Sequence, residues 1–272
     1  MTPQTGSPQL FQHPELDGSS FFWPAGQAGV LLLHGFTATT VEVRPLATLL
    51  RERGYSLSAP LLPGHGTTPE DLNRCRWRDW TAAAEEAFSA LGTHCQSIVV
   101  AGESMGGLLA LHLAARHPDI RGLLLYAPAI RIQRIWLSIL AAPFISIRPK
   151  AYTSGEDPAC YPWQGYTVLP VRAVAQLYQL QRHIHRLLPA VKQPVRIFQG
   201  LQDHTIDPHG AQEICDQIGS SAKQLVWLPD SGHTVLLDRD FHQIAAESLE
   251  FIQQISDEGS QQVRFPLNRM GL

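Results

Sequence analysis

The sequence has few cysteines, no long apolar run and almost no net charge. Its 272 residues include four cysteines, scattered and without a Cys-x-x-Cys pair, so neither a disulfide framework nor a metal site is expected. A formal net charge of −3 gives no reason to expect nucleic acid or an anionic membrane as a partner. The longest apolar stretch, Ile135 to Ile145, is too short to cross a bilayer. An integral membrane segment is therefore not expected.

Signals for export are also lacking. The segment from Met1 to Gly29 is polar and contains scattered prolines, whereas an export signal needs a basic start followed by an apolar core. A cytoplasmic protein with reduced thiols is therefore expected. An apolar fraction of 44% and a charged fraction of 17% are ordinary for a globular protein. The length suits one large α/β domain or two small ones.

Strand-like apolar runs alternate with helix-like segments along most of the chain. This alternation predicts an α/β fold with a mostly parallel sheet and crossover helices. In the first predicted helix, Leu46, Leu49 and Leu50 share one face, and Gly54 caps its end. The predicted strands are 30–34, 55–61, 97–102, 122–127, 195–200 and 224–228, and the predicted helices are 43–53, 80–91, a segment after Ser104, 209–218 and 241–255.

Ser104 lies where a buried-strand pattern ends and a helical pattern begins. It is the serine of a G-x-S-x-G motif that follows a β-branched run and precedes good helix formers. A strand–turn–helix with serine at its apex is the nucleophile elbow, which presents the hydroxyl at the carboxyl edge of the sheet. The turn strains the serine backbone, so a Cβ at Gly102 or Gly106 would collide with it. The alternative is a glycine-rich turn with an incidental serine.

A serine nucleophile needs a base within hydrogen-bond reach and an acid that orients the base. In the elbow fold these follow the serine in the order acid, then histidine. His233 fits this order, because it directly follows Gly232 in a loop after the last predicted strand. Asp203 is predicted as the acid, because it stands in the first turn after strand 195–200. Its rival Asp207, followed by proline, fits a helix cap better.

Two backbone N–H groups must also point at the charge that develops on the substrate oxygen. Met105, the residue after the serine, is expected to supply one of them. Phe36 is expected to supply the other, from the loop His34-Gly35-Phe36-Thr37 after the first predicted strand, because Gly35 permits a close approach. His34 and the Gly64-His65-Gly66 turn are predicted to shape loops.

Between about 131 and 191 the alternation lapses into Ile, Leu and Trp residues interrupted by prolines, followed by a helical pattern from Val171 to Leu188. An insertion at the carboxyl edge of the sheet would lie over Ser104. It is either a lid or acyl-binding wall, or a helical excursion that buries its own core. The expected organisation is a core of 1–130 and 192–256, a cap insertion of 131–191 and a flexible C-terminal tail of 257–272.

With these residues assembled, the chain resembles the α/β-hydrolase superfamily, and more narrowly the bacterial carboxylesterases and monoacylglycerol lipases. The resemblance implies an α/β-hydrolase fold with a small cap, a triad of Ser104, Asp203 and His233, an oxyanion hole at Phe36 and Met105, no cofactor and an apolar acyl pocket. The insertion departs from those relatives in being proline-rich. The resemblance spans about Val30 to Ile255 and is carried by 31–37, 63–66, 102–107, 200–203 and 231–233.

The expected function is hydrolysis of a small-molecule carboxylic ester with an apolar acyl group, through an acyl-enzyme on Ser104. A thioesterase or a carbon–carbon bond hydrolase would show the same triad. Arg131, Arg134 and Arg148 are scattered rather than clustered, so no site for the phosphates of coenzyme A is evident. The alternative from another class is a catalytically silent binder of a hydrophobic ligand. The oligomeric state stays open.

Overall fold

A seven-stranded sheet forms the centre of the computed structural model, which describes residues 10–150 and 160–262. Its strand order is β11-β10-β6-β5-β3-β4-β2. Neighbouring strands run parallel except β2 and β4, which are antiparallel. The strands are β2 (Phe21–Trp23), β3 (Ala28–Leu33), β4 (Ser56–Ala59), β5 (Ser97–Glu103), β6 (Gly122–Tyr126), β10 (Val195–Gly200) and β11 (Lys223–Leu228).

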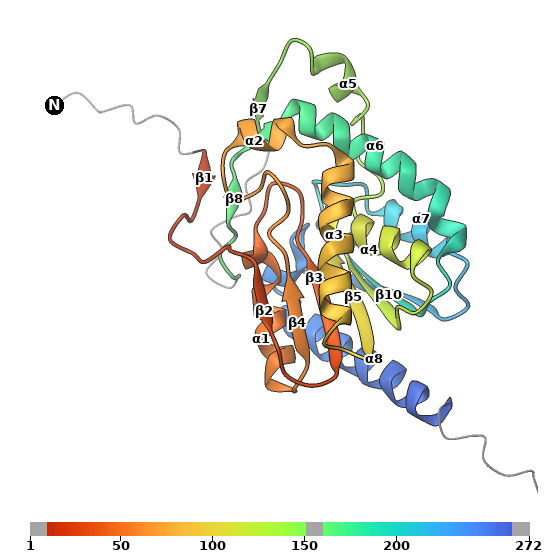
Figure 1. The fold of residues 1–272 in the computed structure, drawn as a ribbon. Coiled ribbons are helices and arrows are strands. Elements are labelled where there is room, and N and C mark those ends of the chain that lie inside the picture. The colour runs from red at the N-terminus through yellow and green to blue at the C-terminus, as the bar shows by residue number, and fades with distance from the viewer. Residues whose placement is uncertain (1–9, 151–159, 263–272) are drawn as a thin grey trace, which may run out of the picture.

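Helices cover both faces of this sheet (Figure 1). Val30 of β3 packs on one face, and Leu31, the next residue, packs on the other, because successive strand side chains point to opposite sides. Burial on both faces explains why the strands read as continuous apolar runs. On the Val30 side lie α1 (Arg44–Glu52) and α8 (Phe241–Gln262), and on the Leu31 side lie α3 (Trp77–Gly92), α4 (Met105–Arg116) and α7 (His209–Gln217).

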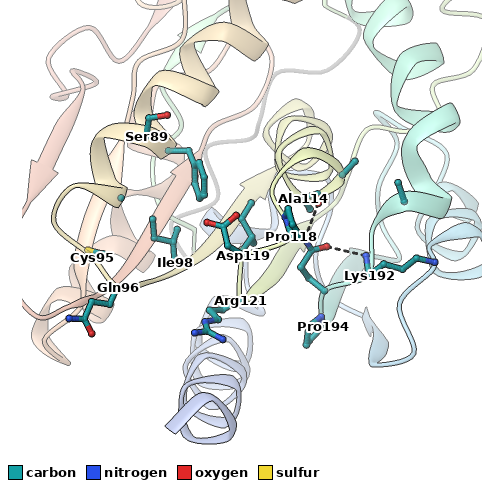
Figure 2. A pocket seen from close by; sticks show the side chains of 16 residues that line it. Ser89, Cys95, Gln96, Ile98, Ala114, Pro118, Asp119, Arg121, Lys192 and Pro194 are labelled. Atoms are coloured by element: carbon teal, nitrogen blue, oxygen red, sulfur yellow. Dashed lines mark hydrogen bonds between the residues drawn. The ribbon is translucent and has the colours of Figure 1, made fainter. Parts of the chain in front are cut away.

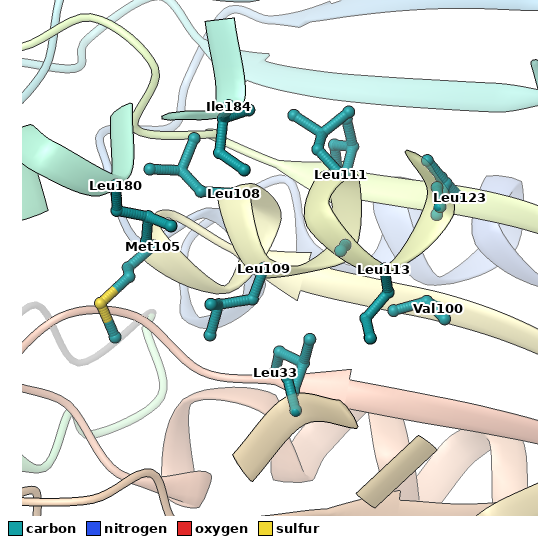
Figure 3. Close-up of a cluster of buried hydrophobic side chains, with 14 of the residues drawn as sticks. Leu33, Val100, Met105, Leu108, Leu109, Leu111, Leu113, Leu123, Leu180 and Ile184 are labelled. Carbon is teal, nitrogen blue, oxygen red and sulfur yellow. The ribbon is translucent and has the colours of Figure 1, made fainter. Parts of the chain in front are cut away.

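The α4 helix is mostly apolar, and all its residues from Met105 to Ala114 are buried. A helix of this kind must be covered on every side. The sheet lies below it, and α6 (Val171–Leu187) crosses above it, where Leu180 and Ile184 meet Leu108 (Figure 3). The residue before α4 is Ser104, so the packing of this helix fixes the position of the serine.

The predicted fold class is confirmed, and the six predicted strands are present with ends shifted by at most a few residues. The edge strand β2 and the short helix α2 (Pro69–Arg74) were not predicted, because they are too short to carry a periodic pattern. The prediction for Leu49 was wrong, since it is 38% exposed. The buried face is centred on Leu46, Ala47 and Leu50, and Leu49 lies roughly 100° from that centre on a helix of 3.6 residues per turn.

The insertion after β6 has two halves that differ in their packing. Its second half, α6, is buried against α4. Its first half projects at the top of Figure 1 as α5 (Leu137–Ala141) and exposes large apolar side chains. These are Trp136, Leu137, Ile139, Leu140, Phe144 and Ile145. Three short strands lie between the helices, namely β7 (Ile147–Pro149), β8 (Gly165–Tyr166) and β9 (Val168–Pro170). β7 pairs with β9, and β8 pairs with β1 (Phe11–Gln12).

The C-terminal helix is longer than predicted. The sequence places its end at Ile255, but α8 continues to Gln262, so the tail expected from 257 begins as helix. The rest of that tail, 263–272, lies outside the described residues, as does 151–159 of the predicted cap. Within the described ranges, no helix combines the length and apolar character that a membrane span requires.

Candidate active site

Ser104 lies at the sharp turn between β5 and α4. Its backbone has φ 55° and ψ −112°, a conformation that is strained for any residue with a side chain. Its N–H donates to the Tyr126 carbonyl at 2.8 Å, and its carbonyl accepts from Ala129 N at 3.1 Å. A Cβ on Gly102 would strike the backbone of Gly106, and one on Gly106 would strike the backbone of β3. The glycines are therefore required by close approach of the backbone.

His233 connects Ser104 to Asp203. Its Nε2 lies 2.9 Å from Ser104 Oγ, and its Nδ1 lies 2.8 Å from Asp203 Oδ2. Burial alone would lower the pKa of His233, but the charge and hydrogen bond of Asp203 outweigh burial and raise it above its ordinary value. The imidazolium form is thus stabilised at this position. The structure brings together the three side chains that the sequence predicts as nucleophile, base and acid.

The two candidate acids have different surroundings. Besides His233, Asp203 accepts hydrogen bonds through Oδ1 from Thr205 N at 2.8 Å and Ile206 N at 3.0 Å. Burial alone would raise the pKa of Asp203, but His233 and these N–H groups hold it below its ordinary value. Asp207 instead accepts from His209 N and forms an ion pair with Arg131 at 2.9 Å. Of these two aspartates, Asp203 is the one that contacts His233.

The loop after β3 packs directly against the serine. A Cβ built on Gly35 would lie 3.2 Å from Ser104 Cβ, so the loop that carries Phe36 passes close to the serine. Met105 is the first residue of α4, and N–H groups in a first helical turn have no partner within the helix. His34 accepts from Leu62 N at 3.0 Å, and burial lowers its pKa to about 4. It is a neutral loop-shaping residue, as the sequence predicts.

The side chains of Glu42, Trp163 and Lys150, which are buried or partly buried and which the sequence analysis missed, contact this loop or each other. Glu42, in the 3-10 turn η1 (Thr40–Val43), accepts from Gly35 N through one oxygen and from Trp163 Nε1 through the other. Lys150 Nζ donates to Thr37 Oγ1 at 2.6 Å. Burial lowers the pKa of Lys150 to about 7. Trp163 and Lys150 come from the insertion, so this part of the chain reaches the loop that carries Phe36.

A pocket of about 690 Å³ lies elsewhere (Figure 2). Among its lining residues, Gln96, Arg121 and Pro194 directly precede β5, β6 and β10. The pocket is therefore at the amino edge of the sheet, whereas Ser104 follows the carboxyl end of β5. None of the predicted site residues lines it. Across the described ranges, no cluster of three or more His, Cys, Asp or Glu side chains has a geometry that could hold a metal ion.

The protein family described as serine aminopeptidase, S33 (Hydrolase_4) matches residues 25–240. The chain belongs to this α/β-hydrolase family. The hydrolase is 36% identical to the thermostable monoacylglycerol lipase of Bacillus sp. strain H-257, over 88% of this chain and 96% of that protein. It is 28% identical to a carboxylesterase of Bacillus subtilis strain 168, over 86% of this chain and 96% of that protein.

Solved structures agree with this assignment. The hydrolase superposes with a TM-score of 0.81 and 32% identity on a chain from the metagenome-derived lipolytic enzymes LipS and LipT, covering 87% of this chain and 98% of that one. A monoglyceride lipase of Saccharomyces cerevisiae superposes with a TM-score of 0.70 and 20% identity, covering 94% and 98%. The yeast enzyme therefore shares the fold.

Sequence reasoning missed Glu42, Trp163 and Lys150 in this hydrolase for a physical reason. Glu42 is separated from Trp163 by 121 residues, and no local pattern links them. Glu103 was missed as well, although the sequence carries a signal for it, namely a charged residue at the end of an apolar strand pattern. In the structure Glu103 is 0% exposed, and a buried acid must find partners or lose its charge.

Proposed function

We propose that this α/β-hydrolase cleaves uncharged carboxylic esters, with Ser104 as nucleophile, His233 as general base and Asp203 as the acid that orients it. The observation that carries the proposal is the continuous hydrogen-bonded path from Ser104 Oγ through both ring nitrogens of His233 to Asp203 Oδ2. A serine with this arrangement can lose its proton as it attacks.

In the first half of the reaction, Ser104 Oγ bonds to the ester carbonyl carbon while its proton passes to His233 Nε2. Asp203 stabilises the imidazolium that forms. The N–H groups of Phe36 and Met105 hold the oxyanion, each contributing about 3 kcal/mol if they act like known donors. The carbon–oxygen bond to the alcohol then breaks, and the alcohol leaves with the proton from His233.

In the second half, water attacks the acyl group on Ser104 and gives a proton to His233. The carbon–oxygen bond to Ser104 breaks, Oγ recovers that proton, and the free carboxylic acid departs. This sequence balances without an added co-reactant. It uses the same oxyanion donors twice, because both halves pass through a tetrahedral intermediate.

The substrate we propose is a lipid ester, with the insertion 131–191 as a cap over the site. The relative from Bacillus sp. is a monoacylglycerol lipase, and the one from Bacillus subtilis is a carboxylesterase. The exposed apolar side chains at the start of the insertion, such as Leu140 and Phe144, add support, because they give an apolar acyl chain a surface to approach.

The test is hydrolysis of nitrophenyl esters of increasing acyl length by the wild-type protein and by Ser104→Ala. We expect turnover that vanishes in the variant, with the best acyl length reporting the size of the acyl pocket. Labelling of Ser104 by a fluorophosphonate probe provides a second readout, since only an activated serine reacts. Labelling without ester turnover would redirect the assignment to a thioesterase or a carbon–carbon hydrolase. Absence of both would indicate a silent binder.

A further inference from the structure

The loop that carries Phe36 rests on a buried carboxylate. Glu42 is 4% exposed, and its Oε2 accepts from Gly35 N at 2.5 Å. A Cβ built on Gly35 would lie 2.9 Å from Glu42 Oε2 and 3.2 Å from Ser104 Cβ, so Gly35 is held between the carboxylate and the serine. The peptide of Gly35 leads directly into Phe36. The Gly35 N–H that donates to Glu42 belongs to the peptide directly before the one that carries the Phe36 N–H.

The insertion holds Glu42 and the loop from the other side. Trp163 Nε1 donates to Glu42 Oε1 at 3.2 Å, and the Trp163 ring lies 4.3 Å from Lys150 Nζ. Lys150 Nζ donates to Thr37 Oγ1 at 2.6 Å. Thr37 has φ 68°, which is unfavourable for a residue with a Cβ, and its carbonyl accepts from Tyr166 N at 2.9 Å. The contacts from the insertion thus maintain a strained residue next to Phe36.

We propose that Glu42 is a positioning residue for the oxyanion loop, and that Trp163 and Lys150 of the insertion hold it in place. The insertion then builds part of the reaction site in addition to covering it. The proposal depends on the function proposed above, because its effect is exerted through the Phe36 N–H and His233.

The hydrogen bonds of Glu42 favour its carboxylate form, because both oxygens accept N–H groups. Burial raises the pKa of Glu42, and the Gly35 N–H, the charge of His233, the Trp163 N–H and Lys150 limit that rise. In the neighbouring Glu103, one carboxylate oxygen accepts a hydrogen bond from Leu236 N, and the other has no hydrogen-bond partner among the described residues. Burial and the charge of Glu42 raise the pKa of Glu103 well above its ordinary value. Of these two acids, Glu103 is therefore the one on which a proton is favoured.

This charge acts on His233 together with the other groups around it. Burial and Asp203 have the largest effects on the pKa of His233. Beyond these, Glu42 raises that pKa and Lys150 lowers it. Removing the negative charge should therefore shift the acid limb of kcat/KM to lower pH, and removing the positive charge should shift it to higher pH. Two further acids of the described chain lie next to residues of the site and are unchanged in these variants: Glu103 directly precedes Ser104, and Asp238 accepts from Gly232 N.

The experiment measures kcat, KM and the pH profile of nitrophenyl ester hydrolysis for Glu42→Gln, Lys150→Met and Trp163→Phe. For Glu42→Gln we expect kcat to fall about 10- to 100-fold with little change in KM, because the reacting groups are misplaced while the acyl pocket is intact. Trp163→Phe keeps an aromatic ring, although a smaller one, but removes the N–H donor to Glu42, and should lower kcat less. Glu42→Gln and Lys150→Met should shift the acid limb in opposite directions.

Controls separate this proposal from general damage. Lys192→Met and Trp227→Phe make the same chemical changes at the amino edge of the sheet and on β11, and should leave kcat and the pH profile as in the wild type. Wild-type kcat in Glu42→Gln, or acid limbs that shift in the same direction in Glu42→Gln and Lys150→Met, would overturn the proposal. If Glu42→Gln does not fold, the other two variants test the proposal. A lower kcat in Trp163→Phe and an acid limb at higher pH in Lys150→Met would support it, and wild-type values in both would overturn it. A wild-type protein without ester turnover would instead overturn the proposed function, and this inference with it.

Discussion

His233 Nε2 lies 2.9 Å from Ser104 Oγ, although the two residues are 129 positions apart in the chain. The contact exists because both residues follow the carboxyl ends of parallel strands in one sheet. Ser104 comes directly after β5, and His233 comes shortly after β11. Side chains from distant parts of the sequence therefore meet at one edge.

The two aspartates after β10 provide a matched pair of variants. Asp203→Asn should lower kcat by about 10⁴-fold, because the amide cannot hold the histidine in the required tautomer. Asp207→Asn should leave kcat within a few-fold of the wild type, since Asp207 contacts His209 and Arg131 instead. Steady-state kinetics of both variants on one nitrophenyl ester measures the two values of kcat. A larger loss of kcat in Asp207→Asn than in Asp203→Asn would make Asp207 the acid that orients His233.

The pH profile should show one acid limb due to His233. The pKa of His233 is raised above its ordinary value of 6.5 despite burial, because of Asp203, and only the neutral ring can accept the serine proton. Activity should therefore be lost as pH falls through a midpoint above 6.5, and should level off at higher pH. A profile of kcat/KM that stays flat down to about pH 4 would exclude His233 as the base.

Substitutions of glycine test the elbow itself. Gly102→Ala should abolish activity and reduce thermal stability, because the new Cβ has no room against the backbone of Gly106. Gly92→Ala at the end of α3 is the control, since the nearest atom to its Cβ would be 3.9 Å away. There we expect a gain of about 0.4–1 kcal/mol in the free energy of unfolding. A tolerated Gly102→Ala would refute the steric argument.

The two halves of the insertion should respond differently to truncation. Leu180→Ala on α6 should lower the free energy of unfolding by about 2–5 kcal/mol, because Leu180 is fully buried against α4. Leu140→Ala on α5 should change it by less than about 0.5 kcal/mol, because Leu140 is 62% exposed. Urea denaturation of both variants measures these differences. Equal losses would mean that α5 is packed in solution.

Several features of this protein were predictable because they depend on neighbouring residues. The turn at Ser104 follows from the steric demands of Gly102 and Gly106, and the strands follow from runs such as Ile98 to Ala101 that suit burial on both faces. The parallel sheet then implies that residues after strand ends share one edge. From these local rules the sequence predicted which serine, histidine and aspartate would meet.

Other features were decided only by the tertiary structure. Leu49 belongs to the apolar face by sequence, yet the exact direction of α1 leaves it partly exposed. The contacts of Glu42 with Trp163 and of Lys150 with Thr37 join segments more than 100 residues apart. Such contacts depend on the position of the insertion relative to the loop after β3, that is, on a chain path that long-range packing determines. Periodicity and turn sterics act over only a few residues, so they contain no information about that path.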